Sequence, residues 1–557
     1  MDRIDERNYW GRPMRRRNLL RASGIGAVGL AGAALIGCGG SSDKSSNGGD
    51  AAKSAPAGGA KPADKTVAIK RGGKLNVAVG AEPLGSLNPH RGQGGGDHKF
   101  FWTMFEGLVQ YNREGVPDTK YSLAEAFEAV DPTTIKFTLR QGIKYHDGTT
   151  MKAEDVRYNI AKVQSEAYKS AARAQILPVT KVDVVDDRTA IFKLDKPNAA
   201  LLTILGDRGG QMVSPTALEK GVEAFDRKPL GGTGPFKFVE WVSDSRVRVQ
   251  KNPDYWRKGV DGNALPYLDE IEWKVIPDNN VALASLESGE VDIVAPPLSE
   301  MDRLEKGGQY QITSFVGSSW SGMYFNLKLA PTDDVNLRRA IAYAIDREAE
   351  NKALNFNRFQ IATGILTPAA KWAYEPVPTA PKFDLAKAKE YLAKSKYPNG
   401  TKITCTIATS QEAATRGALW QDMLKKINVQ LELIPLQTYT NRMWVVQDVN
   451  ALQAGFSIRA DPDGTLSEVV HSKGFYNAGH VENPQLDDII AKARESYDTK
   501  ERKKYYQEAE KILADQVYDV YSTYSAQFRA SRKRVQNVDL TFGAEGKERY
   551  DEFWLNG

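Results

Sequence analysis

The chain offers few side chains at the spacings that catalysis or metal binding requires. It has no glycine-lysine phosphate loop, no His-Glu-x-x-His helix motif and no pair of cysteines at metal-binding spacing. The segment nearest to a nucleophile elbow, Gly317-Ser318-Ser319-Trp320-Ser321-Gly322, has the wrong spacing. The histidines form no i, i+4 pair and stand at positions 90, 98, 146, 471 and 480. The sequence therefore predicts no catalytic residue, no metal site and no cofactor.

Residues suited to binding are abundant in contrast. The chain contains ten Trp, 23 Tyr and 48 Gly residues. The run Gly94-Gly95-Gly96 precedes an expected helix and either exposes backbone amides to a ligand or is a plain flexible loop. A later segment contains Ser319, Trp320 and Tyr324, whose two rings are either cleft walls or core. These residues are candidates for a ligand-binding site.

Alternating strands and helices are expected to position these candidates. Apolar and polar residues alternate at 75–79, 135–139 and 271–275, which predicts strands. Apolar residues at 337, 340, 341, 344 and 345 share one helical face, with Asp333 or Asp334 as its cap. Asn483-Pro484 predicts the start of another helix. Cys405 lies on an alternating strand and is expected to be a buried thiol. The fold class is mixed α/β with several domains.

The composition is that of a soluble globular protein with an unusual start. The 557 residues are 41% hydrophobic and 26% charged, a length that suggests three or four domain-sized units. The net charge is +5, but residues 1–37 carry +4 of it, with seven Arg against three acidic residues. Since the remainder is close to neutral, nucleic acid is not an expected partner.

The first seventy residues resemble an export signal followed by a tether. Arg16-Arg17 precedes a short apolar stretch, 22–36, that ends just before Cys38. Fifteen residues span about 22 Å as a helix, which is short of a ~30 Å bilayer core. We therefore expect a twin-arginine lipoprotein signal over 1–37 and lipidation of Cys38, rather than a buried or interfacial segment with an incidental cysteine. Residues 38–70 are rich in Gly, Ser, Ala, Lys and Pro and are expected to be a flexible tether.

Short blocks along the chain, each weak alone, together resemble the bacterial extracellular solute-binding proteins of family 5. The strongest is the strand, turn and helix start over 135–156, which contains His146-Asp147-Gly148. The others are Leu87-Asn88-Pro89, Glu106-Gly107-Leu108, Gly232-Thr233-Gly234-Pro235-Phe236, Asn252-Pro253-Asp254-Tyr255-Trp256, Gly289-Glu290-Val291-Asp292-Ile293 and the block 337–347. Their order and spacing carry the resemblance over nearly the whole chain after Gly72.

The resemblance implies two lobes that close on a ligand, with an extra domain inserted in the first lobe. Carried onto this chain, lobe I covers 71–115, 230–322 and 526–557. The extra domain covers 116–229 and lobe II covers 323–525, with crossovers near Gly322 and Ser525. We expect His146 to be a structural hydrogen-bonding group. We expect the charged residues of the 337–347 block to lie on the polar side of a helix.

The segment 455–464 departs from the pattern of the peptide binders in this family. Those proteins carry Gly-Trp here and then an Asp, four residues after the Gly, that pairs with the α-amine of the ligand. This chain has Phe456 for the Trp and Arg459 at the Asp position, followed by Asp461-Pro462. Arg459 therefore either faces the cleft and meets an anionic or hydrogen-bond-accepting group, or bridges to Asp461 or Asp463 and shapes the loop.

The function implied by the resemblance is that of the substrate-binding component of an ABC importer. It would capture a peptide or another small polar solute between the lobes and pass it to the permease subunits. The expected site residues are Gly95, Gly96, Ser319, Trp320, Tyr324, Phe456, Arg459 and Asp461. We expect an exported monomer, held at the membrane face by its lipid. A secreted lipoprotein hydrolase or a scaffold with the same cleft is the alternative. Members of the family take peptides, nickel chelates, sugars and opines, so the ligand's identity stays open.

Overall fold

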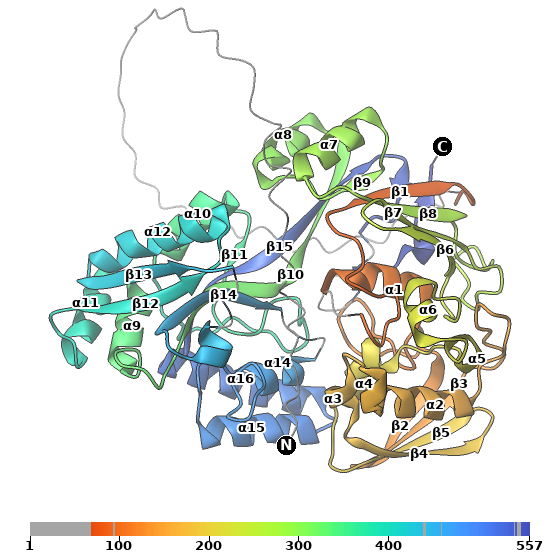
Figure 1. Ribbon diagram of the computed structural model, residues 1–557, viewed down its shortest axis with the longest axis horizontal. Helices are drawn as coiled ribbons and strands as arrows, with labels where there is room; N and C mark the ends of the chain where they lie inside the picture. Colours follow the sequence, from red (N-terminus) through yellow and green to blue (C-terminus); the bar gives the residue numbers. More distant parts are fainter. Residues whose placement is uncertain are drawn as a thin grey trace, which may run out of the picture. The chain divides into compact units, whose positions relative to one another are not determined.

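Two long antiparallel strands, β10 (Tyr310–Phe325) and β15 (Asp519–Arg532), run through the centre of an 11-stranded mixed sheet (Figure 1). The computed structural model describes residues 68–92, 95–437, 440, 442–457, 459, 461–539, 541–542 and 547–556, which belong to one unit. The predicted signal, Cys38 and nearly all of the predicted tether lie outside these residues. The strand order β13-β12-β14-β10-β15-β9-β1-β8-β7-β6 leaves one group of strands on each side of the central pair. Each group and its helices form one lobe, which confirms the predicted two-lobe α/β fold.

The first lobe is built around β1 (Lys74–Val79), which pairs in parallel with β8 (Glu270–Val275) and with β9 (Ile293–Val294). Alternate residues of β1 are buried, as its sequence alternation predicted. Helix α1 (His98–Met104) packs Phe100 against Trp273 of β8. The other elements of this lobe are β6 (Phe236–Val242), β7 (Arg246–Lys251), α7 (Asn279–Ser288), α8 (Met301–Gly307), β16 (Val535–Gln536), β17 (Thr541–Phe542), β18 (Lys547–Glu548) and β19 (Trp554–Leu555).

In the second lobe, β14 (Ala451–Ser457) pairs with β10, and β12 (Thr401–Ile407) and β13 (Val429–Pro435) extend the sheet in parallel. Helix α9 (Val335–Ala344) begins at Asp334 and α15 (Pro484–Glu495) begins at Asn483, and each cap side chain accepts a backbone N–H, so both predicted caps are confirmed. Cys405 is a buried free thiol, as expected. The remaining elements are α10 (Arg347–Asn355), β11 (Gln360–Ile361), α11 (Leu385–Lys394), α12 (Gln411–Lys425), α14 (Pro462–Val469) and α16 (Thr499–Gln516).

A separate four-stranded antiparallel sheet forms the inserted domain, in the order β2-β3-β5-β4. Helix α2 (Ala153–Gln164) covers this sheet through contacts with β4 and β5, and they share one hydrophobic core. The strands are β2 (Ala124–Asp131), β3 (Thr134–Leu139), β4 (Val179–Asp186) and β5 (Thr189–Leu194), and the short helices are α3 (Arg173–Ile176), α4 (Leu201–Ile204), α5 (Pro215–Leu218) and α6 (Val222–Arg227).

The predicted crossovers near Gly322 and Ser525 lie inside β10 and β15. The register between these strands shifts between Val316 and Trp320 and again at Gly322. A Cβ atom at Gly322 would lie 2.0 Å from the carbonyl oxygen of Val520, so no larger residue fits while the strands keep this approach. The predicted lobe boundaries remain predictions.

Two arginines of the 337–347 block are buried, which corrects the expectation that they lie on a polar surface. Arg338 donates to the carbonyl oxygens of Val517 (2.8 Å) and Gln516 (2.9 Å), and Arg347 donates to that of Tyr521 (2.6 Å). Burial lowers the pKa of each guanidinium to about 10. Because the accepting carbonyls flank the start of β15, the two arginines attach α9 and α10 to this central strand.

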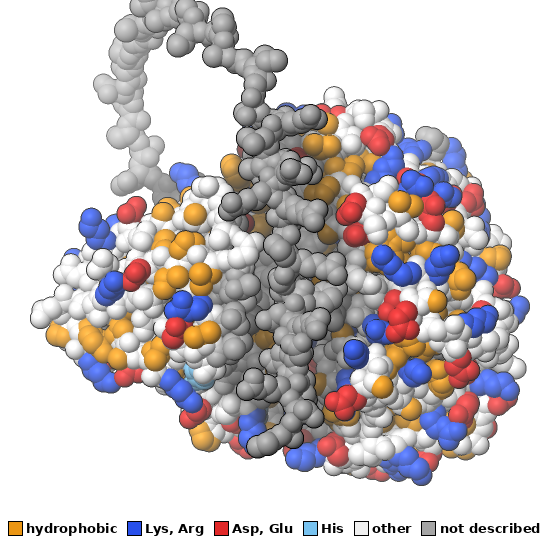
Figure 2. All heavy atoms as spheres, viewed as in Figure 1, with side chains coloured by type: hydrophobic (Ala, Val, Ile, Leu, Met, Phe, Trp, Pro, Cys, Tyr) orange, Lys and Arg blue, Asp and Glu red, His pale blue; other side chains and the backbone are white. Residues whose placement is uncertain are grey.

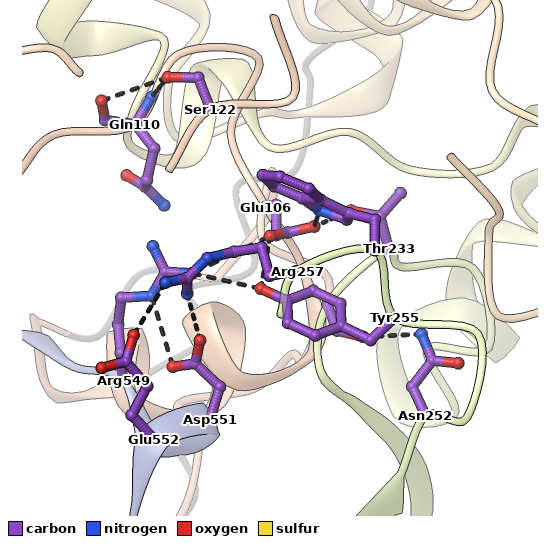
Figure 3. Close-up of polar contacts among 12 residues, drawn as sticks. Glu106, Gln110, Ser122, Thr233, Asn252, Tyr255, Arg257, Arg549, Asp551 and Glu552 are labelled. Atoms are coloured by element: carbon purple, nitrogen blue, oxygen red, sulfur yellow. Dashed lines mark hydrogen bonds and ion pairs between the residues drawn. The ribbon is translucent and has the colours of Figure 1, made fainter. Parts of the chain in front are cut away.

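A buried polar network joins three of the sequence blocks that carry the resemblance (Figure 3). Glu106, just after α1, accepts hydrogen bonds from Thr233 (3.1 Å), Tyr255 (2.8 Å) and Trp256 (2.9 Å). Burial raises the pKa of the Glu106 carboxyl. His146 lies 3.0 Å from the carbonyl oxygen of Gly234 through Nε2, which confirms its structural role. The network fixes the end of α1, and with it the position of the whole short helix.

Candidate ligand-binding site between the lobes

The aromatic candidates of the central strand lie in the core of the second lobe. Trp320 and Tyr324 are 1% and 4% exposed. The Trp320 ring contacts Tyr324 at 4.8 Å and Tyr521 at 4.6 Å between centroids. Ser319 is partly exposed, and its Oγ lies 3.3 Å from that of Ser457 on β14. Of these candidates, Ser319 is therefore the one that reaches the strand surface.

The segment after β14 presents a guanidinium held between rings and a carboxylate. Arg459 donates from Nε and Nη2 to one oxygen of Glu468, at 2.8 and 2.7 Å. Its guanidinium carbon lies 5.4 Å from the ring centroid of Phe456 and 5.7 Å from that of Tyr476. The partner of Arg459 is thus Glu468 on α14, rather than Asp461 or Asp463.

Asp461 forms the start of α14 and a buried ion pair. Its carboxylate accepts from Nη1 and Nη2 of Arg502, at 3.0 and 2.6 Å, and from the backbone N–H of Asp463. Burial acts to lower the pKa of Arg502, but the adjacent Asp461 carboxylate raises it above its ordinary value. Asp463 pairs with Arg494 at 3.1 Å, and burial raises the pKa of Asp463. Both aspartates are therefore already bonded to arginine.

A cavity of about 220 Å³ lies between the inserted domain and the second lobe, beside these ion pairs. Its lining from the inserted domain includes Gln175, Asn198, Ile204 and Asp207, and its lining from the second lobe includes Arg459, Asp461, Asp463, Ser467, Glu468 and Arg494. The wall carries charged groups of both signs and neutral hydrogen-bonding groups. Such a wall suits a solute that itself carries both charges.

The inserted domain and the second lobe also contact each other directly beside this cavity. The backbone N–H of Ala199 donates to the carbonyl oxygen of Arg494 at 2.9 Å. The hydroxyl of Thr203, on α4, lies 3.3 Å from a carboxylate oxygen of Asp461. The described conformation is therefore one in which the inserted domain and the second lobe touch.

The glycine candidates lie directly before α1, and neither Gly95 nor Gly96 lines the cavity. Gly95 and Gly96 belong to a short 3-10 helix, Gly95–Asp97, while Gly94 lies outside the described residues. His98, the first residue of α1, places Nε2 2.8 Å from Oδ1 of Asp207, a residue of the cavity wall. The contact with the cavity wall in this stretch is therefore made by His98, and a role of the glycines in binding remains a prediction.

Sequence reasoning identified Arg459 and Asp461 but missed the charged partners of these residues and of Asp463. In the sequence, Glu468 is 9 residues from Arg459, Arg494 is 31 residues from Asp463 and Arg502 is 41 residues from Asp461. One signal was present for Arg502, because it precedes Tyr506 by one helical turn on the face of α16 that also buries Leu513. A cation on a buried face indicates a buried anionic partner.

Three further observations concern the charged surface, metal ligands and the described helices. Lys, Arg, Asp and Glu side chains are interspersed on the face drawn in Figure 2, without a large patch of one sign. Within the described ranges, no group of three or more His, Cys, Asp or Glu side chains could hold a metal ion. None of the described helices has the length and apolar character needed to cross a membrane.

Comparison with known proteins gives one consistent result. The family model described as "Bacterial extracellular solute-binding proteins, family 5 Middle" matches residues 118–477. The glutathione-binding protein GsiB of Shigella flexneri is 28% identical over 453 residues, which cover 78% of this chain and 86% of GsiB.

Two solved structures have a similar fold. The oligopeptide-binding protein AppA from Bacillus subtilis, in complex with a nonapeptide, has a TM-score of 0.71 and 22% identity, over 88% of this chain and 100% of AppA. The ABC transporter substrate-binding protein CtaP from Listeria monocytogenes has a TM-score of 0.76 and 24% identity, over 87% of this chain and 100% of CtaP.

Proposed function

This chain belongs to the bacterial extracellular solute-binding proteins of family 5, and from that premise we propose that it captures a peptide or a similar small polar solute between its lobes for an ABC importer. The bound solute would be delivered to the permease subunits in the membrane. No chemical step is required, because the binding protein releases the solute unchanged. Family membership favours this role over that of a secreted hydrolase or a scaffold.

The observation that carries the proposal is the cavity with walls from both sides of the molecule. Arg459, Glu468 and Arg494 lie on one wall and Asp207 on the other. A solute held here contacts both walls, so binding energy favours the state in which they meet. That coupling is what an importer needs to distinguish a loaded from an empty binding protein.

Three features support a peptide-like solute. The curated relative is named for glutathione, which is itself a tripeptide, and a structural neighbour holds a nonapeptide. The cavity wall offers groups of both signs, and a peptide is a zwitterion. Gentle isolation of the exported chain, followed by denaturation and mass spectrometry of the released molecules, tests this class. Recovery of peptides supports it, and recovery of one non-peptide solute in stoichiometric amount contradicts it.

Binding is expected to close the lobes. Addition of the recovered solute should raise the melting temperature, because the solute binds only the folded chain. It should also reduce the radius of gyration in small-angle scattering, because the lobes come together about β10 and β15. A rise in melting temperature without a change in scattering would mean a rigid pocket and would contradict closure.

We also propose that the chain is exported by the twin-arginine route and held at the membrane by lipid on Cys38, as a monomer. The support is the order of Arg16-Arg17, the apolar stretch 22–36 and Cys38. Replacing both arginines with lysine should abolish export. Cys38→Ser should release the exported chain from the membrane fraction, because the variant lacks the lipidated residue. Stable anchoring takes two or more acyl chains, which the proposal places on Cys38. Normal export of the first variant, or membrane retention of the second, would contradict the corresponding half.

A further inference from the structure

A second cavity, of about 350 Å³, opens where β1 and β9 separate. The register pairs these parallel strands at Val77 and Ile293, and the residues that follow, as far as Gly80 and Pro296, line the cavity. Residues 526–529 of β15 and Phe359, after α10, form further parts of the lining. The cavity therefore lies at the carboxyl ends of parallel strands, where open α/β sheets bind ligands.

Lys99 contributes a charged group without a partner to this cavity. It follows His98 on α1, whose ring contacts Asp207 of the first cavity wall. Among the residues that the structure describes, none forms a hydrogen bond or ion pair with its ammonium, which lies 5.7 Å from the ring centroid of Phe100. Burial lowers the pKa of Lys99, although the Glu548 carboxylate acts in the opposite direction. A partly buried ammonium without an acceptor is costly until an acceptor reaches it.

The other charged residues that line the cavity compensate each other. Arg529 forms an ion pair with Glu548 of β18, and its guanidinium carbon lies 4.6 Å from the ring centroid of Phe315. Because this pair is neutral as a unit, the lining keeps one uncompensated positive charge, on Lys99. The Asp97 carboxylate also acts to raise the pKa of Lys99, but it accepts from the backbone N–H of Leu84 and is not part of the lining. A single negative group on a ligand would therefore balance the charge of the residues that line the cavity.

We propose that this second cavity receives a carboxylate of the imported solute, with the Lys99 ammonium as its hydrogen-bond donor and Arg529 beside it. The proposal rests on the proposed function and makes an anionic group a required part of the solute. Phe359 lines the cavity from the second lobe, so the carboxylate site is complete only when the lobes meet.

The test uses calorimetric titration of the tag-free mature chain with matched probes. The probes are glutathione and Ala-Ala-Ala as free acids, and glutathione diethyl ester and Ala-Ala-Ala amide as forms with blocked carboxyls. The variants are Lys99→Met, which keeps an unbranched apolar stem, and Lys99→Arg, which keeps the charge. Lys387→Met is the matched control, because that exposed ammonium also lies near a ring, 5.5 Å from the Tyr343 centroid, but lines neither cavity.

The expected result is that at least one free acid binds and that its blocked form binds about 10- to 100-fold more weakly. Lys99→Met should remove this difference, whereas Lys99→Arg should keep part of it and Lys387→Met should keep all of it. Without solute, Lys99→Met should melt at or above the temperature of the unmodified chain, because the variant no longer holds a partly buried ammonium without an acceptor.

Three other results would overturn the proposal in different ways. Equal binding of acid and blocked forms, or a difference that survives in Lys99→Met, would refute the carboxylate site and leave the importer function standing. No binding of any peptide probe would refute the peptide-like solute, and the carboxylate site with it. A clear fall in the melting temperature of unliganded Lys99→Met would assign Lys99 to structure.

Discussion

Replacing Arg502 with leucine is expected to lower the free energy of unfolding by about 3–5 kcal/mol. The side chains of Arg502 and Asp461 are only 5% and 4% exposed, and they form two short hydrogen bonds. Loss of the guanidinium leaves the Asp461 carboxylate buried with no cation, and it also removes a donor to the carbonyl oxygen of Ala493. Urea unfolding of the unliganded chain measures the change.

Arg442→Leu is the matched control for this prediction. Arg442 and Asp448 form an equally bidentate pair, at 2.6 and 2.7 Å, but their side chains are 34% and 46% exposed. Water replaces the lost partner there, so the expected cost is below about 1 kcal/mol. Equal costs for the two variants would show that burial adds nothing to the pair and would contradict the description of Arg502 and Asp461 as a buried ion pair.

Replacing Arg459 with alanine is expected to weaken solute binding by about 2 kcal/mol, or roughly 30-fold. Its guanidinium lines the first cavity, and its planar set of N–H donors suits a carboxylate or another acceptor on the solute. The measurement is calorimetry with the solute recovered from the isolated protein, together with melting of the unliganded chain.

Glu468→Gln distinguishes contact with the solute from a role in loop structure. This variant breaks the ion pair with Arg459 but keeps the guanidinium in the cavity. If Arg459 bonds the solute, Glu468→Gln should bind within about threefold of the original chain, or more tightly, because the competing carboxylate is gone. If Arg459 only shapes the segment after β14, both variants should lose affinity and stability alike, and Arg459→Lys should not recover binding.

Local features of the fold were predictable because they depend on neighbours in the sequence. Asp334 and Asn483 cap helices whose amides lie two or three residues away, and β1 shows its buried face by simple alternation. Cys405 was predictable for the same reason, since its strand neighbours defined a buried face. The two-lobe arrangement was predicted from the order of the family blocks, because no local sequence pattern indicates it.

Features that depend on distant partners were not predictable from one sequence. Arg338 and Arg347 stand on an amphipathic helix and the helix after it, and the carbonyl groups that bury them come from β15 and its approach, more than 170 residues later. Glu468 was likewise not identified as the partner of Arg459, because Asp461 and Asp463 are nearer in sequence. The second cavity depends on where β1 and β9 separate, which only the sheet register shows.

The most direct test of capture between two lobes is hydrogen exchange, measured by mass spectrometry with and without the recovered solute. Amides on both sides of the first cavity should exchange more slowly in the complex, at 174–178 and 198–207 in the inserted domain and at 459–468 in the second lobe. Residues 385–394, on the outer helix α11, provide an internal reference that should not change. Simultaneous protection of both walls is the expected result. Protection confined to one wall would mean that the solute binds a single lobe and would contradict capture between them.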